Sequence, residues 1–105
     1  MKGRTPTKAE SDFMDKVCSL GCIVCRLFYR IDSPCSFHHI DGRTKPGAHF
    51  HGIGLCGKHH QEPDNRKPKV WISRHGDGKR AFEDKYDTEH ELYLKTLELI
   101  GEGVH

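Results

Sequence analysis

The chain has 105 residues and a formal net charge of +2, and with 34% hydrophobic and 30% charged residues its mean hydropathy is −0.74. One small domain with a thin core fits these values, which exclude an enzyme with a separate cofactor domain. No apolar run approaches the roughly 20 residues of a membrane span, and the N-terminal residues lack the apolar stretch of a signal peptide, so we expect a cytoplasmic protein with reduced thiols and no membrane partner.

The first predicted element is a helix that follows a flexible arm, residues 1–6. Thr7 and Glu10 have the spacing of a capping box, and Gly21 is a typical residue to end the helix. Apolar residues recur between them at helical spacing and predict one buried face. We expect residues 7–105 to form a single domain.

The middle of the chain predicts three short strands and one short helix. The apolar and aromatic content of residues 26–31, 36–40 and 50–55 favours strands, although two glycines weaken the third of these predictions. A short helix is expected to open with the segment 56–60, before a proline-rich stretch ends it.

Two helices are predicted in the last third of the chain. The first covers residues 79–86, and the second starts where Thr88 and Glu91 repeat the capping spacing and stops at Gly101. Between the short middle helix and these two, Trp71 is expected to anchor the thin core rather than to serve as a platform for base stacking.

Cysteines and histidines are crowded in a pattern typical of metal ligands. The chain has five cysteines, an odd number that argues against a disulfide framework, and seven of its nine histidines fall within residues 38–75. Cys22 and Cys25 are separated by two residues, as are Cys56 and His59. Two such pairs can complete one tetrahedral site, so we predict a structural Zn²⁺ held by these four residues.

Two cysteines remain outside this set. Cys18 shares the apolar face of the first helix and is expected to pack as a small core residue, while Cys35 precedes the second predicted strand and fits either role. A competing ligand set that uses one of them stays open.

Positive charge is concentrated in the middle of the chain. Residues 41–80 carry nine basic and four acidic side chains, whereas residues 81–105 carry two basic and seven acidic ones. A positive field around a metal site suits a polyanion such as nucleic acid, although a solvated face of mixed charge fits the same counts.

Three histidines are predicted to have separate tasks. His38 and His39 are neighbours on a predicted strand and therefore point to opposite faces, so they do not easily bind one ion together. His60 follows the zinc ligand His59 on a predicted helix, where it is rotated by about 100° and can face the strands.

The segments Phe37-His38-His39-Ile40 and Leu55-Cys56-Gly57-Lys58-His59-His60 resemble the HNH, or ββα-metal, nucleases. The longer string that starts with His38-His39-Ile40-Asp41-Gly42-Arg43 and extends past Arg74-His75-Gly76 is similar to the phage recombination-enhancement nucleases, a branch that depends on RecA. The resemblance implies an α+β fold: a small zinc-stapled ββα-metal core with flanking N- and C-terminal helices.

The resemblance also implies roles for individual residues. His39 matches the general base that activates water, and His38, His60 and His75 match the ligands of a catalytic divalent ion, Mg²⁺, Mn²⁺ or Zn²⁺. His51 stands where these nucleases usually have Asn, five residues before the helix cysteine. It either orients the base through a ring nitrogen or serves as a further ligand.

Phosphodiester hydrolysis fits these residues on chemical grounds, because a neutral imidazole can accept a proton from water at physiological pH and a cation can neutralise the leaving oxygen. The scissile phosphate or its neighbours have four candidate partners: Arg43, Lys45, Arg74 and Lys79. We therefore expect a metal-dependent endonuclease that acts on single- or double-stranded DNA, and the resemblance implies a role in phage recombination. The resemblance adds a RecA filament as a partner and a bacterial host cell as the location.

Two alternatives come from other classes of protein. The first is a zinc-binding DNA adaptor without chemistry, which would keep its DNA binding when His39 is replaced. The second is a protein whose histidines hold only a further structural metal. His39, which has no predicted ligand role, is next to the predicted ligand His38, and neither alternative explains this arrangement.

Overall fold

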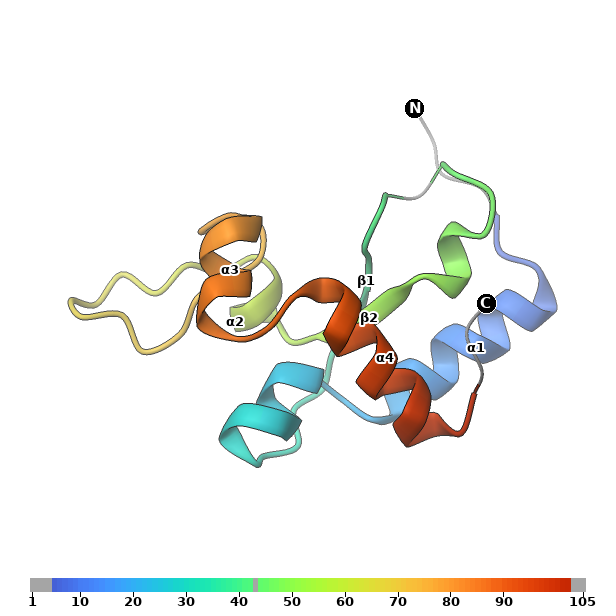
Figure 1. The fold of residues 1–105 in the computed structure, drawn as a ribbon, viewed down its shortest axis with the longest axis horizontal. Coiled ribbons are helices and arrows are strands. Elements are labelled where there is room, and N and C mark those ends of the chain that lie inside the picture. Colours follow the sequence, from blue (N-terminus) through green and yellow to red (C-terminus); the bar gives the residue numbers. More distant parts are fainter. Residues whose placement is uncertain (1–4, 43, 103–105) are drawn as a thin grey trace.

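The computed structural model describes residues 5–42 and 44–102, which form a small α+β fold around a two-stranded sheet (Figure 1). The described elements, in chain order, are α1 (Lys8–Ser19), the π-helical turn η1 (Cys25–Tyr29), β1 (Ser36–His39), the 3-10 turn η2 (Ala48–Phe50), β2 (Gly52–Leu55), α2 (Gly57–His60), α3 (Lys79–Lys85) and α4 (Glu89–Ile100). None of the helices within the described ranges is long and apolar enough to cross a membrane.

The strands β1 and β2 pair in antiparallel fashion, with His39 opposite Gly52 and His38 opposite Ile53. A Cβ atom at Gly52 would lie 2.3 Å from the ring of Phe37, and one at Gly54 would lie 2.7 Å from the sulfur of Cys35. The two glycines that weakened the strand prediction are therefore required in the strand, because neighbouring groups occupy the space of a side chain.

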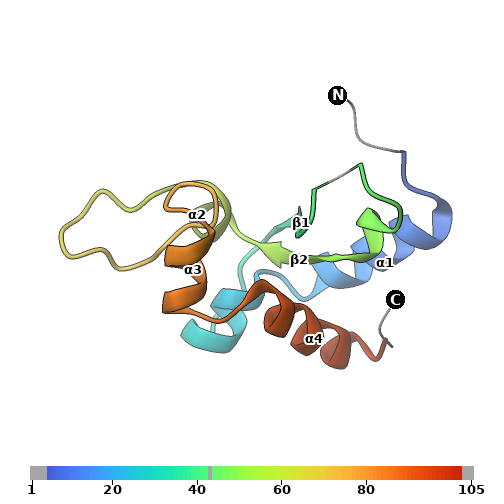
Figure 2. The ribbon, with the colours of Figure 1, turned by 45° about the horizontal axis from the view of Figure 1, so that its top comes forward.

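Helices α1 and α4 lie beside each other and against β2 (Figures 1 and 2). Thr7 accepts the amide hydrogen of Glu10 and the Glu10 carboxylate accepts that of Thr7, so the predicted capping box starts α1. Gly101, with a φ of 73°, ends α4 as predicted. The core between these helices and the sheet contains Phe13, Val17, Ile23, Val24, Ile53, Leu55, Phe82, Leu92, Tyr93 and Leu97.

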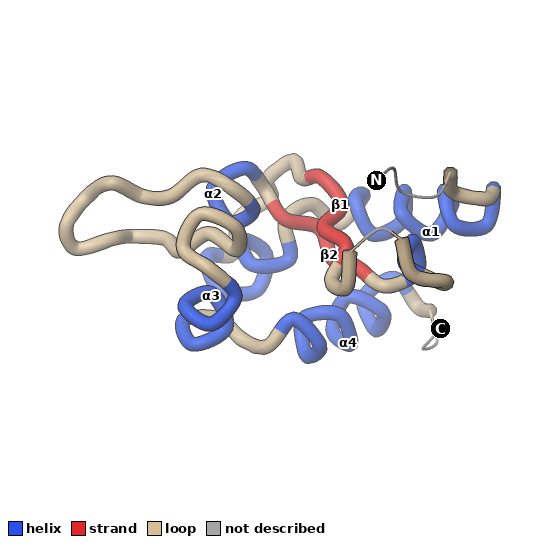
Figure 3. The backbone as a smooth tube through the Cα atoms, turned by 90° about the horizontal axis from the view of Figure 1, so that it is seen from above, coloured by secondary structure: helices blue, strands red, loops and turns tan. Residues whose placement is uncertain are grey.

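A long loop, residues 61–78, joins α2 to α3 and projects from the end of the molecule that lies away from α1 (Figures 1 and 3). Trp71 belongs to this loop and is half-buried outside the core cluster, so the prediction that it anchors the core was wrong. The position of Trp71 matters for function, because it leaves an aromatic ring near the surface.

The predicted strand over residues 26–31 is also wrong, because the chain forms the π-helical turn η1 there. The amide of Cys25 donates to the sulfur of Cys22, and the amide of Arg26 donates to the carbonyl of Cys22. These bonds continue a helical turn from the first cysteine pair, which overrides the strand preference of the aromatic residues that follow. Arg30, with a φ of 57°, then ends the turn.

The remaining differences are smaller. The returning strand begins at Gly52, because Ala48–Phe50 forms the 3-10 turn η2. The short helix α2 has Cys56 as its N-cap, and α3 ends one residue before the predicted boundary. Most of the predicted arm, residues 1–4, lies outside the described residues.

Candidate metal centre and catalytic pocket

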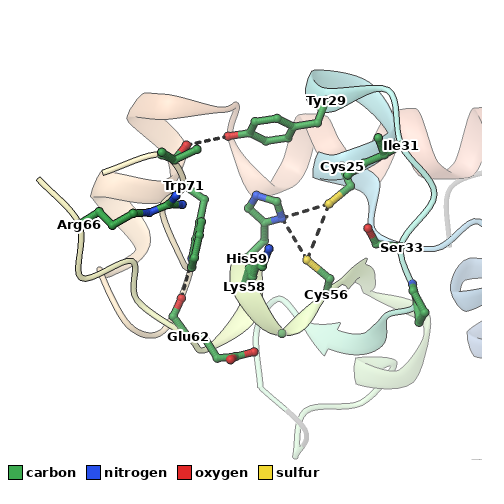
Figure 4. A pocket seen from close by; sticks show the side chains of 13 residues that line it. Cys25, Tyr29, Ile31, Ser33, Cys56, Lys58, His59, Glu62, Arg66 and Trp71 are labelled. Carbon is green, nitrogen blue, oxygen red and sulfur yellow. Dashed lines mark hydrogen bonds between the residues drawn. The ribbon is translucent and has the colours of Figure 1, made fainter. Parts of the chain in front are cut away.

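The structure brings the four predicted zinc ligands together from η1, its preceding turn and α2. The Nδ1 atom of His59 lies 3.5 Å from the sulfurs of Cys22 and Cys25 and 3.2 Å from that of Cys56 (Figure 4 shows the last two). The sulfurs of Cys25 and Cys56 are 3.7 Å apart, and all four residues are buried.

These separations fit a tetrahedral ion. Zinc–sulfur and zinc–nitrogen bonds of normal length place ligand atoms about 3.8 Å apart for two sulfurs and about 3.6 Å apart for sulfur and nitrogen. The four atoms thus lie at nearly the spacing that one Zn²⁺ requires. Three thiols and one imidazole are also the donor set that zinc prefers in structural sites. The cluster can hold a structural metal ion.

Burial changes the acid–base properties of these ligands. It raises the pKa of Cys22 to about 12 and that of Cys25 above its usual value, and it lowers the pKa of His59 to about 4. A buried thiolate needs a compensating charge, which a divalent ion supplies. The Nε2 atom of His59 is buried and has no hydrogen-bond partner among the described residues, whereas its Nδ1 atom faces the sulfurs.

The two remaining cysteines lie beside each other and outside this cluster. The thiol of Cys35 donates to the carbonyl of Cys18 over 3.6 Å, and a hydrogen bond between the two side chains lowers the pKa of Cys18. Neither residue belongs to a ligand cluster within the described part of the chain. The geometry therefore favours the predicted set over one that uses Cys18 or Cys35.

A second cluster consists of His38, His60 and His75, whose rings are mutually adjacent. The ring centroids are 5.0 to 5.2 Å apart, and one nitrogen from each ring lies within 4.8 Å of the others. The three rings line an open pocket of about 500 Å³ together with His39 and Phe37. This set can converge on one divalent ion that remains accessible from solvent.

A buried carboxylate holds the first of these histidines. Glu89, at the start of α4, is 1% exposed, and its Oε2 atom lies 2.5 Å from Nε2 of His38. Burial raises the pKa of Glu89, but the hydrogen bond from His38 and the positive charge of Arg74 outweigh this effect and hold the pKa below its usual value. Glu89 is therefore ionised, and Nδ1 of His38 is left for a metal.

The other two histidines are positioned through α2. The Oγ atom of Ser36 lies 3.1 Å from Nδ1 of His60, which leaves Nε2 of His60 for a ligand role. The amides of Arg74 and His75 donate to the carbonyls of His59 and His60, so the segment that carries His75 is attached to the end of α2. Burial, with nearby positive charge, lowers the pKa of His60 to about 4 and also lowers that of His75, which keeps both rings neutral and able to bind a metal.

His39 lies at the edge of the same pocket and contacts a histidine that was not predicted to meet it. Its Nε2 atom is 3.0 Å from Nδ1 of His49, which is buried in η2. His51, the residue in the place of the usual Asn, instead pairs with Asp41 over 2.9 Å. Because Asp41 opens the loop after β1, His51 braces this loop while His49 contacts the predicted base.

The phosphate-binding candidates differ in exposure and in their contacts with acidic groups. The guanidinium of Arg74 donates to Glu89 over 3.1 Å, and the Lys79 ammonium lies 3.8 Å from the same carboxylate. Lys45 is exposed on the loop before η2, and Arg43 lies outside the described residues. Arg74 and Lys79 thus lie close to the histidine cluster, where their positive charges offset the negative charge of the Glu89 carboxylate.

Sequence reasoning missed three partners of the histidines: Ser36, His49 and Glu89. Ser36 stands two residues before His38 on β1, and the alternation of a strand could have placed it on the same face. Glu89 lies 51 residues from His38, and no local pattern connects them.

The fold and its two ligand clusters define a small α+β protein with a buried Cys₃His site and an open three-histidine pocket. The chain matches a family model described as recombination enhancement, RecA-dependent nuclease, over residues 6–101. The chain therefore belongs to this family of nucleases, as its resemblance to the phage branch predicted. The family is one of nucleases in recombination enhancement, and its description names RecA as the protein on which activity depends.

Proposed function

We propose that the protein is an HNH-type, metal-dependent DNA endonuclease that hydrolyses phosphodiester bonds in phage recombination. The observation that carries the proposal is the position of His39 beside His38, His60 and His75 in one open pocket. A general base next to a cluster of metal ligands is the minimum set for hydrolysis by an activated water. A RecA filament on DNA is the proposed context of the cleavage.

In this proposal, His39 accepts a proton from the water that attacks phosphorus. His38, His60 and His75 would hold a divalent ion, Mg²⁺, Mn²⁺ or Zn²⁺, whose chemistry is to offset negative charge on the leaving 3′-oxygen. The products are a 5′-phosphate and a 3′-hydroxyl.

The neighbouring residues keep this site in position. His49 fixes the ring of His39 through their 3.0 Å contact, and Glu89 fixes the ring of His38 through the 2.5 Å contact. His51 holds the loop after β1 through Asp41. Two histidines thus share the tasks of orienting the base and holding the loop beside it.

The Cys₃His cluster has a structural role in the proposal. A Zn²⁺ on Cys22, Cys25, Cys56 and His59 would attach η1 to α2 and so fix the helix that carries His60. Lys45 and Arg43 are the candidates for contacts with the DNA backbone, since Arg74 and Lys79 are close to Glu89.

The test is cleavage of supercoiled plasmid and of single-stranded circular DNA by the wild type and by His39→Ala. Each protein is incubated with Mg²⁺ or Mn²⁺ and then with EDTA, with and without a RecA filament. His90→Ala, at an exposed position on α4, is the matched control. We expect metal-dependent cutting by the wild type and by the control, and a loss of cutting in His39→Ala.

Cutting by His39→Ala at the wild-type rate would exclude this residue as the base. DNA binding without cutting, in every condition and by every form, would instead support the adaptor without chemistry.

A further inference from the structure

A second pocket, which the cleavage chemistry does not use, lies next to the Cys₃His cluster. It has a volume of about 420 Å³, and Tyr29, Ile31, Val70 and Trp71 give it an aromatic and aliphatic lining (Figure 4). Three of these side chains are unusually exposed for their type: Tyr29 at 37%, Ile31 at 54% and Val70 at 51%. This is an apolar surface that the fold itself does not cover.

Two cations lie over the ring of Trp71, in a pocket that is also lined by one acid, Glu62. The Lys58 ammonium lies 4.9 Å from the centre of the indole ring and the Arg66 guanidinium carbon 5.1 Å from it. Figure 4 shows the ring edge-on, with Arg66 on one side and Lys58 on the other. A flat aromatic surface with exposed cations beside it complements a nucleobase with its phosphates, whereas a plain apolar groove for a protein partner does not require the cations.

The pocket is held in shape by a buried carboxylate. Asp64 is 2% exposed, and it accepts the amide hydrogens of Val70 and Trp71 as well as the guanidinium of Arg66 over 3.0 Å. The indole nitrogen of Trp71 donates to the carbonyl of Glu62 over 2.8 Å. These bonds hold the Trp71 ring in place within the long loop before a ligand binds, and only the exposed Lys58 side chain has to move.

We propose that this pocket binds one base of single-stranded DNA. Trp71 stacks on the base and the Lys58 ammonium contacts the adjoining phosphate, while Arg66 stays paired with Asp64. The contact between an exposed lysine and an aromatic ring is weaker than base stacking on indole, so the base displaces the Lys58 ammonium, which remains near the phosphate. Bases in a duplex are already stacked and paired, and the pocket therefore selects single strands.

The pocket and the proposed cleavage site are lined by adjacent residues of α2. His59 lines this pocket and His60 lines the histidine pocket, so α2 separates the two. A base held by Trp71 places the neighbouring nucleotides over α2, next to His60. The proposal rests on the proposed function, because it takes DNA as the substrate.

Trp71 is the only tryptophan of the chain, and its fluorescence reports directly on the pocket. The zinc-loaded protein is titrated, without Mg²⁺ or Mn²⁺, with a short oligothymidylate, with an abasic oligonucleotide of equal length and with a duplex, and a denaturing gel checks that the DNA stays intact. We expect saturable quenching by the oligothymidylate alone.

Affinities are measured in parallel by fluorescence anisotropy with labelled oligothymidylate. Trp71→Ala weakens binding about tenfold, whereas Trp71→Phe, which keeps a ring, weakens it less. Lys95→Ala, an exposed lysine on α4, leaves it unchanged. Because Trp71 is outside the core cluster, Trp71→Ala is expected to stay folded and to melt cooperatively.

Binding of oligothymidylate without quenching, or with wild-type affinity in Trp71→Ala, would overturn the proposal. Quenching by RecA protein in the absence of DNA, but not by DNA, would also overturn it and would assign the pocket to a protein partner. Neither result depends on plasmid cutting, which tests the proposed function separately.

Discussion

Replacement of Glu89 by Gln tests whether a buried carboxylate organises the histidine cluster. The change keeps the shape of the side chain but removes the negative charge that faces His38, Arg74 and Lys79. Loss of a carboxylate that orients a metal-bound histidine typically costs about 10- to 100-fold in metal affinity, or about 1.4–2.7 kcal/mol. The Gln oxygen can still accept one hydrogen bond, so we expect the lower half of this range.

The same substitution also affects stability. Arg74 is 18% exposed on its side chain and Lys79 is 55% exposed, so both cations can reach water after the carboxylate is lost. We therefore expect a loss of about 1–3 kcal/mol in the free energy of unfolding, below the 3–5 kcal/mol of a fully buried broken pair. Each kcal/mol corresponds to a drop of about 4–8 °C in Tm for a domain near this size.

The assay is calorimetric titration of the zinc-loaded protein with Mn²⁺, together with the Mn²⁺ concentration that gives half-maximal plasmid cutting. Glu91→Gln is the matched control, because Glu91 is an exposed acid in the same first turn of α4 and loses the same favourable interaction with the helix N-terminus. A Glu89→Gln protein with the Mn²⁺ affinity of Glu91→Gln would refute the orienting role of Glu89.

Three further predictions concern the Cys₃His cluster, the proposed base His39 and the turn at Gly21. Cys25→Ala removes one of four ligands and is expected to unfold the domain, since zinc binding here supplies folding energy; a cooperative, unshifted melting curve would exclude the zinc site. His39→Ala is expected to lose cutting but to keep wild-type Mn²⁺ affinity, and calorimetry showing lost affinity would make His39 a ligand. Gly21→Ala adds a Cβ atom 2.5 Å from the carbonyl oxygen of Ser33 at a φ of +74°, whereas Gly42→Ala, at +84°, meets nothing within 4 Å. Both substitutions cost about 1–2 kcal/mol of stability, because alanine disfavours the left-handed backbone. Thermal melting should show a larger loss of stability for Gly21→Ala, and equal losses would contradict the clash.

Features encoded by neighbouring residues could be predicted from the sequence. Thr7 with Glu10 and Thr88 with Glu91 marked the starts of α1 and α4, and Gly101 marked the end of α4. These signals act within one helical turn, so the local sequence contains all that they need. The spacing of the Cys and His pairs likewise indicated which four side chains would meet.

Features that depend on distant contacts could not be predicted in this way. The π-helical turn η1 replaced a strand because the first cysteine pair imposes a helical turn on residues with strand preference. Glu89 meets His38 only because α4 packs against β2. His49 contacts His39 because η2 turns the chain before β2 begins, and a strand extended to residue 50 left no place for that turn.

The two ligand clusters are joined by α2, and this connection makes them interdependent. A helix of four residues is too short to be stable alone, so its position depends on what holds its ends. Cys56 and His59 attach it to the Cys₃His cluster, while the carbonyls of His59 and His60 accept the amides of Arg74 and His75. Removal of the structural ion would release Cys56 and His59, and with them the helix that presents His60. We expect extraction of zinc to unfold the domain, as for Cys25→Ala, and the Mn²⁺ affinity measured by calorimetry to be lost with the fold, although none of the three pocket histidines has been changed. Unchanged Mn²⁺ affinity in the zinc-free protein would show that packing alone holds α2 and that the two sites are independent.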